Sequence, residues 1–302
     1  MISAEPYLKT QRVAQALGVS VSTIKRWVDS GMIQAARTVG KHRLIPFSEA
    51  LRLAREQGFP EANLVMLSGL ASRPGEREAG FGSPVDVLER MLRDGRRTEA
   101  RSFLHAYFHS GAGAVGLADD LIRPVMERIG HGWMAGSLDV YQEHEATETV
   151  TSALRELVTR HGPGRPDGPL ALGAATEGDP YVLPGLLGEL VLLELGWRVR
   201  NLGINLPLRS LAVATLKHRP KLIFISAGYI RDEDQFVKEY RSFHESAAAV
   251  GAAVIVGGQA LGPAVRSRLL FAGHGDRMAH LAEFARRFSP LAESPTLGDA
   301  GL

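Results

Sequence analysis

The spacing of apolar positions changes twice along the chain, and each change marks a different kind of structure. In the first 58 residues, short helical patterns are separated by Gly and Ser turns. Between residues 85 and 160 apolar residues recur every four positions, which predicts helices with one buried face. The clearest series is Leu117, Leu121, Val125 and Ile129. From residue 169 onward, short apolar runs alternate with helical patterns, so we expect three folded parts.

Four short apolar runs in the last part predict β-strands. They cover residues 170–174, 199–202, 222–226 and 253–256. Because helical patterns separate these runs, they predict βαβ units and a parallel sheet. Gly- and Pro-rich stretches predict linkers before the second part, clearest at 71–84, and before the third, at 161–168.

The first part has the pattern of a helix-turn-helix. One helix is expected over 9–17, a turn at 18–20 and a second helix over 21–30. The glycine of the turn tolerates left-handed backbone, and its serine caps the next helix. The second helix buries Ile24 and Trp27 and exposes its polar side chains where recognition helices meet DNA. These candidate DNA contacts are Ser22, Thr23, Lys25 and Arg26.

A tight basic hairpin is expected after the second helix, and a wing of this kind contacts phosphates. Its candidate contacts are Arg37, Lys41, His42 and Arg43. Residues 1–58 carry nine basic and four acidic side chains, a net of +5, whereas the whole chain carries +2. This basic head predicts double-stranded DNA as a partner.

The stretch from Tyr7 to Leu53 resembles the winged helix-turn-helix of the MerR and excisionase families. The matching features are Val13-Ala14, Leu17–Ser20, Ser22–Ile24, Arg26-Trp27, the Gly31 stop and the wing Gly40–Arg43. The resemblance implies a DNA-binding domain over 1–60 followed by a linker over 61–84. A helical hairpin that does not bind DNA is the alternative.

Small and polar residues follow each predicted strand of the last part. They are Gly178, Asp179 and Tyr181 after the first strand, Gly203 after the second, Ser226 after the third, and Gly257 and Gly258 after the fourth. Ligands of open parallel sheets bind beyond the carboxyl ends of the strands, and small residues let the backbone approach a large ligand. Ordinary turns contain the same residues, so both interpretations stay open here.

Residues 169–290 resemble the B12-binding domain shared by methionine synthase, the mutases and light-sensing regulators. The family pattern is Asp-x-His-x-x-Gly, then Leu-Gly, Ser and Gly-Gly. Its matches here are Gly178-Asp179, Leu202-Gly203, Ser226 and Gly257-Gly258. The sequence departs from the pattern at Tyr181, which stands where the family has its cobalt-ligating His, and at Pro184, which replaces the motif's Gly.

The resemblance implies a cobalamin cofactor, with adenosylcobalamin as the expected form. A phenol is a poor substitute for imidazole as a cobalt ligand, so three outcomes stay open. Cobalamin binds without a protein ligand; or another tetrapyrrole binds, such as haem, with Tyr181 as its candidate metal ligand; or the domain is a scaffold without a cofactor.

Residues 85–161 resemble the four-helix cap of CarH-type and LitR-type photoreceptor regulators. The match is Trp133, nine intervening residues and then Glu143-His144. The resemblance implies that these three side chains line the upper face of the cofactor. Met134 stands where the light-sensing members have a His. Its thioether is a candidate ligand for a soft metal, and a Met that fills a helix interface is the alternative.

The resulting fold class is a multidomain α plus α/β protein: a winged helix-turn-helix, a four-helix bundle cap and a Rossmann-like (flavodoxin-like) parallel sheet. We expect a DNA-binding transcriptional regulator, a repressor that senses a tetrapyrrole and light and forms a homo-oligomer (dimer or tetramer). The alternatives are a ligand-free regulator, whose B12-type domain serves oligomerisation or partner docking, and a corrinoid-dependent methyl carrier.

Composition narrows the function classes. The chain has 302 residues and no cysteine, which excludes disulfides, iron–sulfur clusters and thiolate zinc sites and fits a cytoplasmic protein. We find no Ser/His/Asp, Walker or metal-hydrolase pattern, so no enzymatic activity is expected. No apolar stretch is long enough to predict a membrane span, and residues 291–302 are expected to form a disordered tail.

Overall fold

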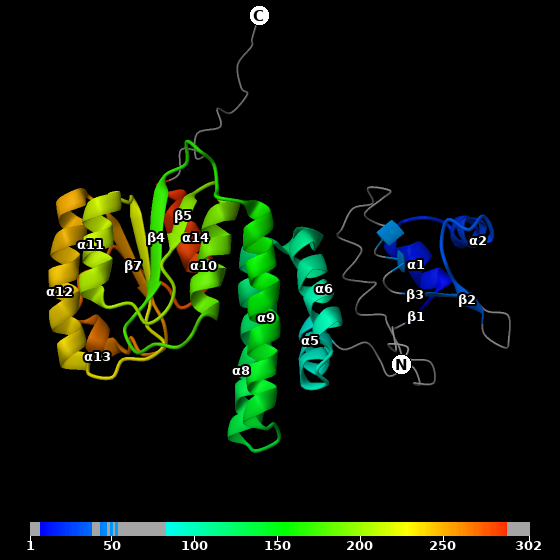
Figure 1. Cartoon of the computed structure of the whole chain (residues 1–302), viewed down its shortest axis with the longest axis horizontal. Coiled ribbons are helices and arrows are strands. Elements are labelled where there is room, and N and C mark those ends of the chain that lie inside the picture. The colour runs from blue at the N-terminus through cyan, green and yellow to red at the C-terminus, as the bar shows by residue number, and fades with distance from the viewer. Residues whose placement is uncertain (1–6, 38–42, 47–48, 51, 54–82, 289–302) are drawn as a thin grey trace, which may run out of the picture. The chain divides into compact units, whose positions relative to one another are not determined.

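The chain divides into two units, residues 1–153 and 154–302, and each is described by itself. The computed structural model describes residues 7–37, 43–46, 49–50, 52–53 and 83–288 (Figure 1). The tip of the expected wing, most of the linker over 61–84 and the tail over 291–302 lie outside the described residues. The expected domain boundaries stay a prediction.

The head combines two helices with a small antiparallel sheet. Its elements are β1 (Tyr7–Lys9), α1 (Thr10–Ala16), α2 (Val21–Asp29), β2 (Ala36–Arg37) and β3 (Arg43–Pro46). Strand β3 pairs with both β1 and β2, so the two arms of the expected wing hairpin are present. The first strand was not expected, because Lys9 was assigned to the following helix. A core around Leu8, Ile24 and Ile45 holds these elements together.

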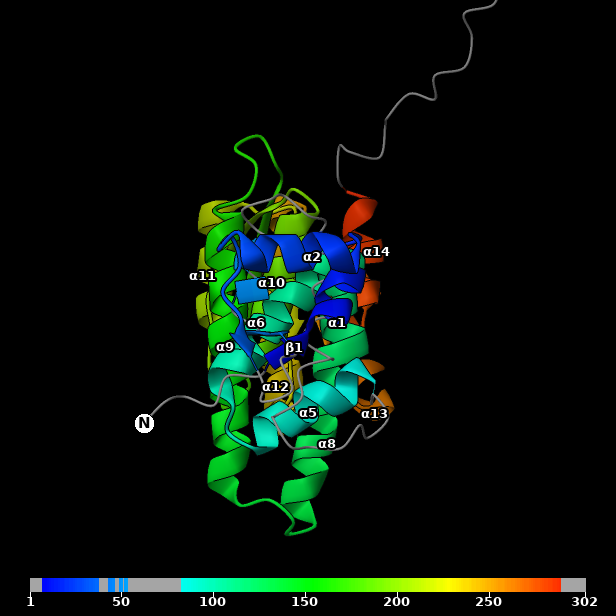
Figure 2. The same cartoon turned by 90° about the vertical axis from the view of Figure 1, so that its right-hand side faces the viewer.

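The residues after the head form a helical bundle, as expected, and its last helix crosses the boundary between the two units. Its helices are α5 (Pro84–Arg93), α6 (Arg97–Tyr107), α7 (Gly113–Gly116), α8 (Arg123–Met134) and α9 (Val140–His161), with π-helical turns at Phe108–Ala112 and Leu117–Ile122. The chain reverses at 135–139, so α9 runs antiparallel to α8 (Figure 2). The π-helical turns were not expected, because the four-residue apolar repeat passes through them.

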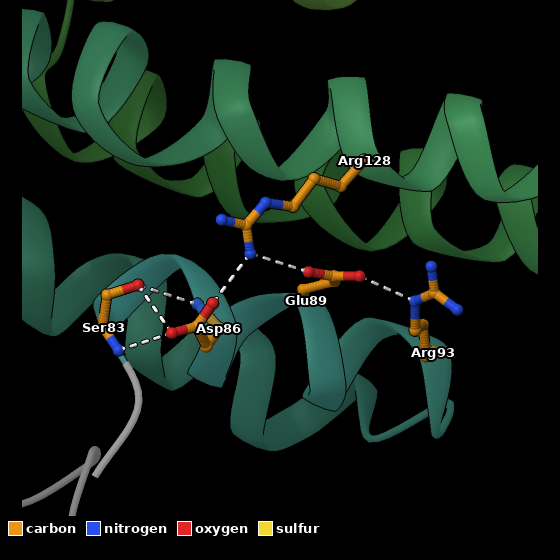
Figure 3. Close-up of polar contacts among 5 residues, drawn as sticks. All are labelled: Ser83, Asp86, Glu89, Arg93 and Arg128. Carbon is orange, nitrogen blue, oxygen red and sulfur yellow. Dashed lines mark hydrogen bonds and ion pairs between the residues drawn. The ribbon is translucent and has the colours of Figure 1, made fainter.

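A strip of charge links α5 to α8. The Arg128 guanidinium donates to Asp86 at 2.7 Å and to Glu89 at 3.0 Å, and Glu89 also accepts from Arg93 at 2.9 Å (Figure 3). Asp86 and Ser83 form a reciprocal capping box at the start of α5. The bonds from Arg128 and Ser83 hold the pKa of Asp86 below its usual value. The strip therefore fixes where the bundle begins after the linker.

The second unit is built on a five-stranded sheet. Its strands are β4 (Leu170–Ala175), β5 (Arg198–Asn201), β6 (Leu222–Ser226), β7 (Ala253–Gly257) and β8 (Gly273–His274). They are all parallel, in the order β5-β4-β6-β7-β8, which is the flavodoxin-like order. The four expected strands are confirmed to within one residue at each end. The fifth was missed because Gly273 and His274 form no apolar run.

Helices cover both faces of this sheet. They are α10 (Leu183–Glu194), α11 (Leu208–His218), α12 (Glu233–Val250), α13 (Pro263–Arg266) and α14 (Met278–Arg286). Helices α11 and α12 lie on one face, and α10 and α14 lie on the other (Figure 1). Strand β6 is buried along its whole length, as expected for the centre of a parallel sheet. No helix in the described part of the chain is both long and apolar enough to span a membrane.

Two glycines in the mostly exposed stretch 161–168 approach another loop closely. A Cβ on Gly164 would overlap the carbonyl oxygen of Trp197, and a Cβ on Gly168 would overlap that of Gly196. The backbone that leads into β4 therefore packs directly against the backbone at Gly196 and Trp197. The Gly-Pro composition reflects this close approach, which a linker pattern does not predict.

The buried ring of Phe224 lies over two glycines. A Cβ on Gly173 of β4 would overlap this ring, and a Cβ on Gly188 of α10 would come within 2.9 Å of it. The two missing side chains therefore make the space that the ring fills between the sheet and α10.

Gly173→Ala is expected to lower the free energy of unfolding by about 1–3 kcal/mol, because the added methyl group overpacks the core beside Phe224. Urea denaturation of the whole chain measures the change. Gly262→Ala is the matched control, since a Cβ there meets no atom within 4 Å. Equal stability of the two variants would contradict the assigned packing.

Candidate nucleic-acid interface and ligand edge

The turn before the recognition helix α2 is built as the sequence predicts. Gly18 has φ +65°, and the Val19 N–H donates to the Ala14 carbonyl, which closes α1. The Ser20 hydroxyl accepts from the Thr23 N–H at 3.1 Å and caps α2. Gly31, at φ +78°, follows the end of the helix. These four positions fix where the helix begins and ends.

The exposed face of α2 carries two cations. Lys25 and Arg26 are exposed, as is Ser22, while Ile24 is fully buried. Thr23 was expected to be exposed, but it is half-buried, and its hydroxyl lies 2.9 Å from that of Ser20. Its side chain therefore belongs to the cap. The role of these residues in DNA contact stays a prediction.

Arg43 joins the wing to the recognition helix. Its guanidinium donates to both carboxylate oxygens of Asp29, at 2.7 and 2.9 Å, and its side chain is 25% exposed. Arg43 is therefore partly neutralised, whereas Lys25 is not in an ion pair in the described part of the head. Strand β2 includes Arg37, but the side chain of Arg37, together with Lys41 and His42, lies outside what the structure describes.

A buried carboxylate organises the carboxyl edge of the sheet. Asp179, in the loop after β4, is fully buried. One of its oxygens accepts from the Tyr181 N–H at 2.9 Å and the other from the Gly228 N–H at 2.5 Å. Since Gly228 lies beyond β6, this single side chain ties the ends of two adjacent central strands together.

Two asparagines fix the neighbouring loop after β5. The Asn205 side chain accepts from the Gly178 N–H at 2.7 Å, and the Asn201 side chain accepts from the Gly203 N–H at 3.0 Å. Asn201 also donates to Glu189 at 3.0 Å, and burial raises the pKa of this carboxyl group. Asn205 adopts φ +53°, a left-handed conformation that Asn tolerates better than most residues.

The ends of β6 and β7 present small groups. The Ser226 hydroxyl is buried and has no hydrogen-bond partner in the described part of the chain. Gly258 has φ +115°, and a Cβ there would overlap the carbonyl oxygen of Ala227; a Cβ on Gly257 would overlap that of Gly275. At Gly203 the space around a Cβ is open. The predicted edge residues thus lie at the ends of successive parallel strands.

Tyr181 leans across this edge. Its side chain is half exposed, and a Cβ on Gly228 would come within 2.6 Å of its ring. Gly228 is therefore required wherever the tyrosine ring keeps this position. In the described residues, no group of three His, Asp or Glu side chains is placed to hold a metal ion.

The turn between α8 and α9 exposes the predicted cap residues. Trp133 is 49% exposed and Met134 is 68% exposed, so Met134 does not fill an interface between helices of the bundle. Glu143 accepts from the Thr147 hydroxyl at 3.0 Å, and its other carboxylate oxygen lies 3.6 Å from Nε2 of the exposed His144. The turn thus brings the ends of two helices together with their polar groups accessible.

Two family models and two curated relatives match parts of this chain. Residues 7–60 match the family model of a helix-turn-helix domain, and residues 85–157 match that of a B12 binding domain. The repressor CarA of Myxococcus xanthus is 29% identical over 76% of this chain and 79% of its own length. The repressor CarH of the same organism is 33% identical over 39% of each chain.

This chain is similar to CarA and CarH and matches the models of a helix-turn-helix domain and a B12 binding domain. Both relatives are named as transcriptional repressors, which supports the expected class of transcriptional regulator. The B12 match covers the helices of the bundle, whereas the sequence pattern had placed the B12 signature in the sheet.

A solved structure supports the fold of about two thirds of this chain. The monomethylamine corrinoid protein of Methanosarcina barkeri aligns with a TM-score of 0.57 at 16% identity, over 68% of this chain and 98% of its own. At this identity the likeness concerns the fold alone. It confirms a helical part followed by a five-stranded parallel α/β part.

The residues of this edge fit a cobalamin in part. The unpartnered Ser226 hydroxyl and the open space at Gly203 suit a bulky polar ligand at the carboxyl edge. Tyr181 does not supply the imidazole that the family pattern contains. The edge therefore fits the body of the ligand, and its metal ligand is the part that differs.

Sequence reasoning missed Asn201 and Asn205 as parts of this edge. Each fixes a predicted residue through a hydrogen bond, Asn201 to Gly203 and Asn205 to Gly178. The available signal was weak, since asparagines and glycines after predicted strands are common in ordinary turns.

Asp179→Ala is expected to lower the free energy of unfolding by about 1–3 kcal/mol, because the N–H groups of Tyr181 and Gly228 lose their acceptor. Hydrogen exchange of those two amides should accelerate more than exchange in the middle of β6. The neighbouring Glu177→Ala, which removes an exposed carboxylate from the same loop, is the control. If both amides keep their protection from hydrogen exchange in Asp179→Ala, Asp179 does not hold the two loops together.

Proposed function

We propose that this protein is a cytoplasmic transcriptional repressor whose binding to double-stranded DNA responds to a tetrapyrrole, cobalamin, and to light. The proposal rests on the presence of two candidate binding surfaces in one chain. The capped helix α2 exposes Lys25 and Arg26, and the carboxyl edge of the sheet holds the unpartnered Ser226 hydroxyl beside glycine backbone.

Reading of DNA is assigned to the head. Lys25 and Arg26 lie on the exposed face of α2, where a recognition helix meets base edges and phosphates. The pair of Arg43 with Asp29 holds the base of the wing against α2 and cancels one negative charge close to the duplex. Phosphate contacts supply affinity, and base contacts supply specificity.

Response to the ligand is assigned to the remainder of the chain. Adenosylcobalamin, when bound, would supply a carbon–cobalt bond that visible light breaks. Ser226 and Gly203 would accommodate the ligand at the sheet edge. The family resemblance also assigns Trp133, Glu143 and His144 to cofactor binding. A ligand that binds the assembled homo-oligomer more tightly than the free protomer shifts the population toward that assembly.

Haem is the second candidate ligand, and Tyr181 is the observation that favours it. The phenol is half exposed at the ligand edge, and tyrosine is an established axial ligand of haem iron. In this alternative the protein keeps its DNA-binding role and senses haem in place of cobalamin.

Replacement of Lys25 or Arg26 by Gln is expected to weaken binding to duplex DNA. The slope of log K against log salt concentration should fall by about 0.9 for each phosphate that the variant no longer neutralises. Fluorescence anisotropy over a salt series measures both quantities. Arg241→Gln, which removes an exposed cation from α12, is the matched control.

Arg43→Gln should also weaken binding, because it leaves the Asp29 carboxylate uncompensated. Wild-type affinity in all three head variants would exclude this interface.

Absorption spectra recorded in the dark and after illumination, with adenosylcobalamin and haem supplied separately, test the ligand. A retained corrin spectrum that changes on illumination is the expected result, and Trp133→Ala should abolish that retention without changing the circular dichroism. Tyr181→Phe separates the candidates, because removing the phenol oxygen should shift a haem Soret band and leave a corrin spectrum unchanged. Retention of neither pigment would reject ligand sensing and leave a regulator whose B12-type domain serves assembly.

A further inference from the structure

The amino edge of the parallel sheet holds a hollow of about 570 Å³. It lies at the starts of β4 and β5 and beside the turn that leads from α11 to β6. Because all strands run in one direction, this edge is opposite the one where the loops of Asp179 and Ser226 gather. The hollow is therefore separate from the ligand edge, and it lies wholly within the second unit.

Positive charge dominates the walls of the hollow. Half of its ten lining residues are Lys or Arg, namely Arg198, Arg200, Lys217, Arg219 and Lys221, with His218 among them. The one acid of the lining, Asp167, is already paired with Arg165 at 2.8 Å. Arg200, Lys217, Arg219 and Lys221 have no ion-pair partner among residues 83–288. Like charges that converge without counter-charge repel one another, so the arrangement favours an anion from outside.

Two ordinary explanations account for part of this charge. Lys217 and His218 lie in the last turn of α11, where cations offset the helix dipole. Arg198 and Arg200 lie on the edge strand β5, where charge discourages pairing with other chains. Arg219 is the C-cap residue of α11, so the helix dipole also favours its charge, but neither explanation accounts for its backbone conformation.

The backbone conformation of Arg219 is a second observation, independent of the positive charge. It adopts φ +48° and ψ +57°, and it is one of only two non-glycine residues with positive φ in the described part of the chain. Glycine adopts this conformation without steric cost and is the usual residue just after a helix. The other case, Asn205, uses its side chain to hold the Gly178 loop. A left-handed arginine at such a position favours a use for its guanidinium.

One wall of the hollow is already positioned. The Arg198 Nε donates to the Gly168 carbonyl at 2.8 Å, which fixes this guanidinium while its two terminal nitrogens stay available. Gly168 is itself held against the backbone of Gly196. Guanidinium groups match the oxygens of phosphate in geometry as well as charge. The lining contains no Phe, Tyr or Trp ring on which a base could stack, and its single imidazole belongs to His218 in the last turn of α11.

We propose that this hollow binds an anion with several phosphate groups and recognises its phosphates alone. The sources of that chemistry are a free polyphosphate or nucleotide and the phosphodiester backbone of duplex DNA. The site goes beyond the proposed function, because it uses neither α2 nor the ligand edge.

Calorimetric titration of the full chain with inorganic tripolyphosphate at low salt tests the site. Arg200→Gln and Arg219→Gly should each weaken binding about tenfold, the loss expected for a hydrogen bond between charged groups. Arg241→Gln, which removes one positive charge from the exposed face of α12, should bind tripolyphosphate as the wild type does. Arg219→Gly should melt no lower than the wild type, since glycine suits its backbone, so loss of binding there is not misfolding.

Two further measurements identify the source of the phosphate groups and separate this site from the DNA contacts of the head. If duplex DNA displaces tripolyphosphate even from the Lys25→Gln, Arg26→Gln double variant, the source is the DNA backbone; if it does not, the source is a free polyphosphate. Tripolyphosphate affinity that is unchanged in Arg200→Gln and Arg219→Gly would overturn the proposal. Tighter binding of a poly-glutamate peptide than of tripolyphosphate, dependent on the same two arginines, would also overturn it in favour of an acidic protein partner.

Discussion

The buried carboxylate of Asp179 is the constraint on which the ligand edge depends. It joins the loops that follow β4 and β6, and every other predicted edge residue lies in these loops or beside them. A charged group without exposure persists in a core only where hydrogen bonds compensate its lost hydration, and here two backbone N–H groups do so. Asn205 extends the arrangement sideways to the loop after β5, so three strand ends share one hydrogen-bonded frame.

The two edges of the sheet have opposite chemistry for a common reason. In a parallel sheet every strand starts at one edge and ends at the other, so each edge collects one class of loop. The carboxyl edge has short, glycine-rich loops held by Asp and Asn. The amino edge collects Arg198 at the start of β5 and Lys217 and Lys221 shortly before β6, because β5 and β6 both pair with β4.

Much of the fold followed from local patterns, whereas contacts between distant residues did not. Apolar runs located four strands, and the Gly18–Ser20 turn located both helices of the head, because these signals are contained in a few consecutive residues. Strand β8 has no such signal, since two residues pair only through the backbone of β7. The left-handed Asn205, the Asp29 partner of Arg43 and the basic hollow all depend on distant contacts. Tyr181 was located correctly in its loop, but its packing against Gly228 needed the structure.

The strand order also determines when each part becomes complete during synthesis. Strand β3 of the head pairs with β1 fewer than 40 positions earlier, as in the partners Leu8 and Ile45, so the head needs only nearby chain. The central strand β4 pairs with β6, with Ala171 beside Leu222, and β6 in turn needs β7. Contacts this far apart in sequence form late, after the intervening chain has left the ribosome. A growing chain therefore has a finished DNA-reading head long before it has the sheet that is proposed to control it.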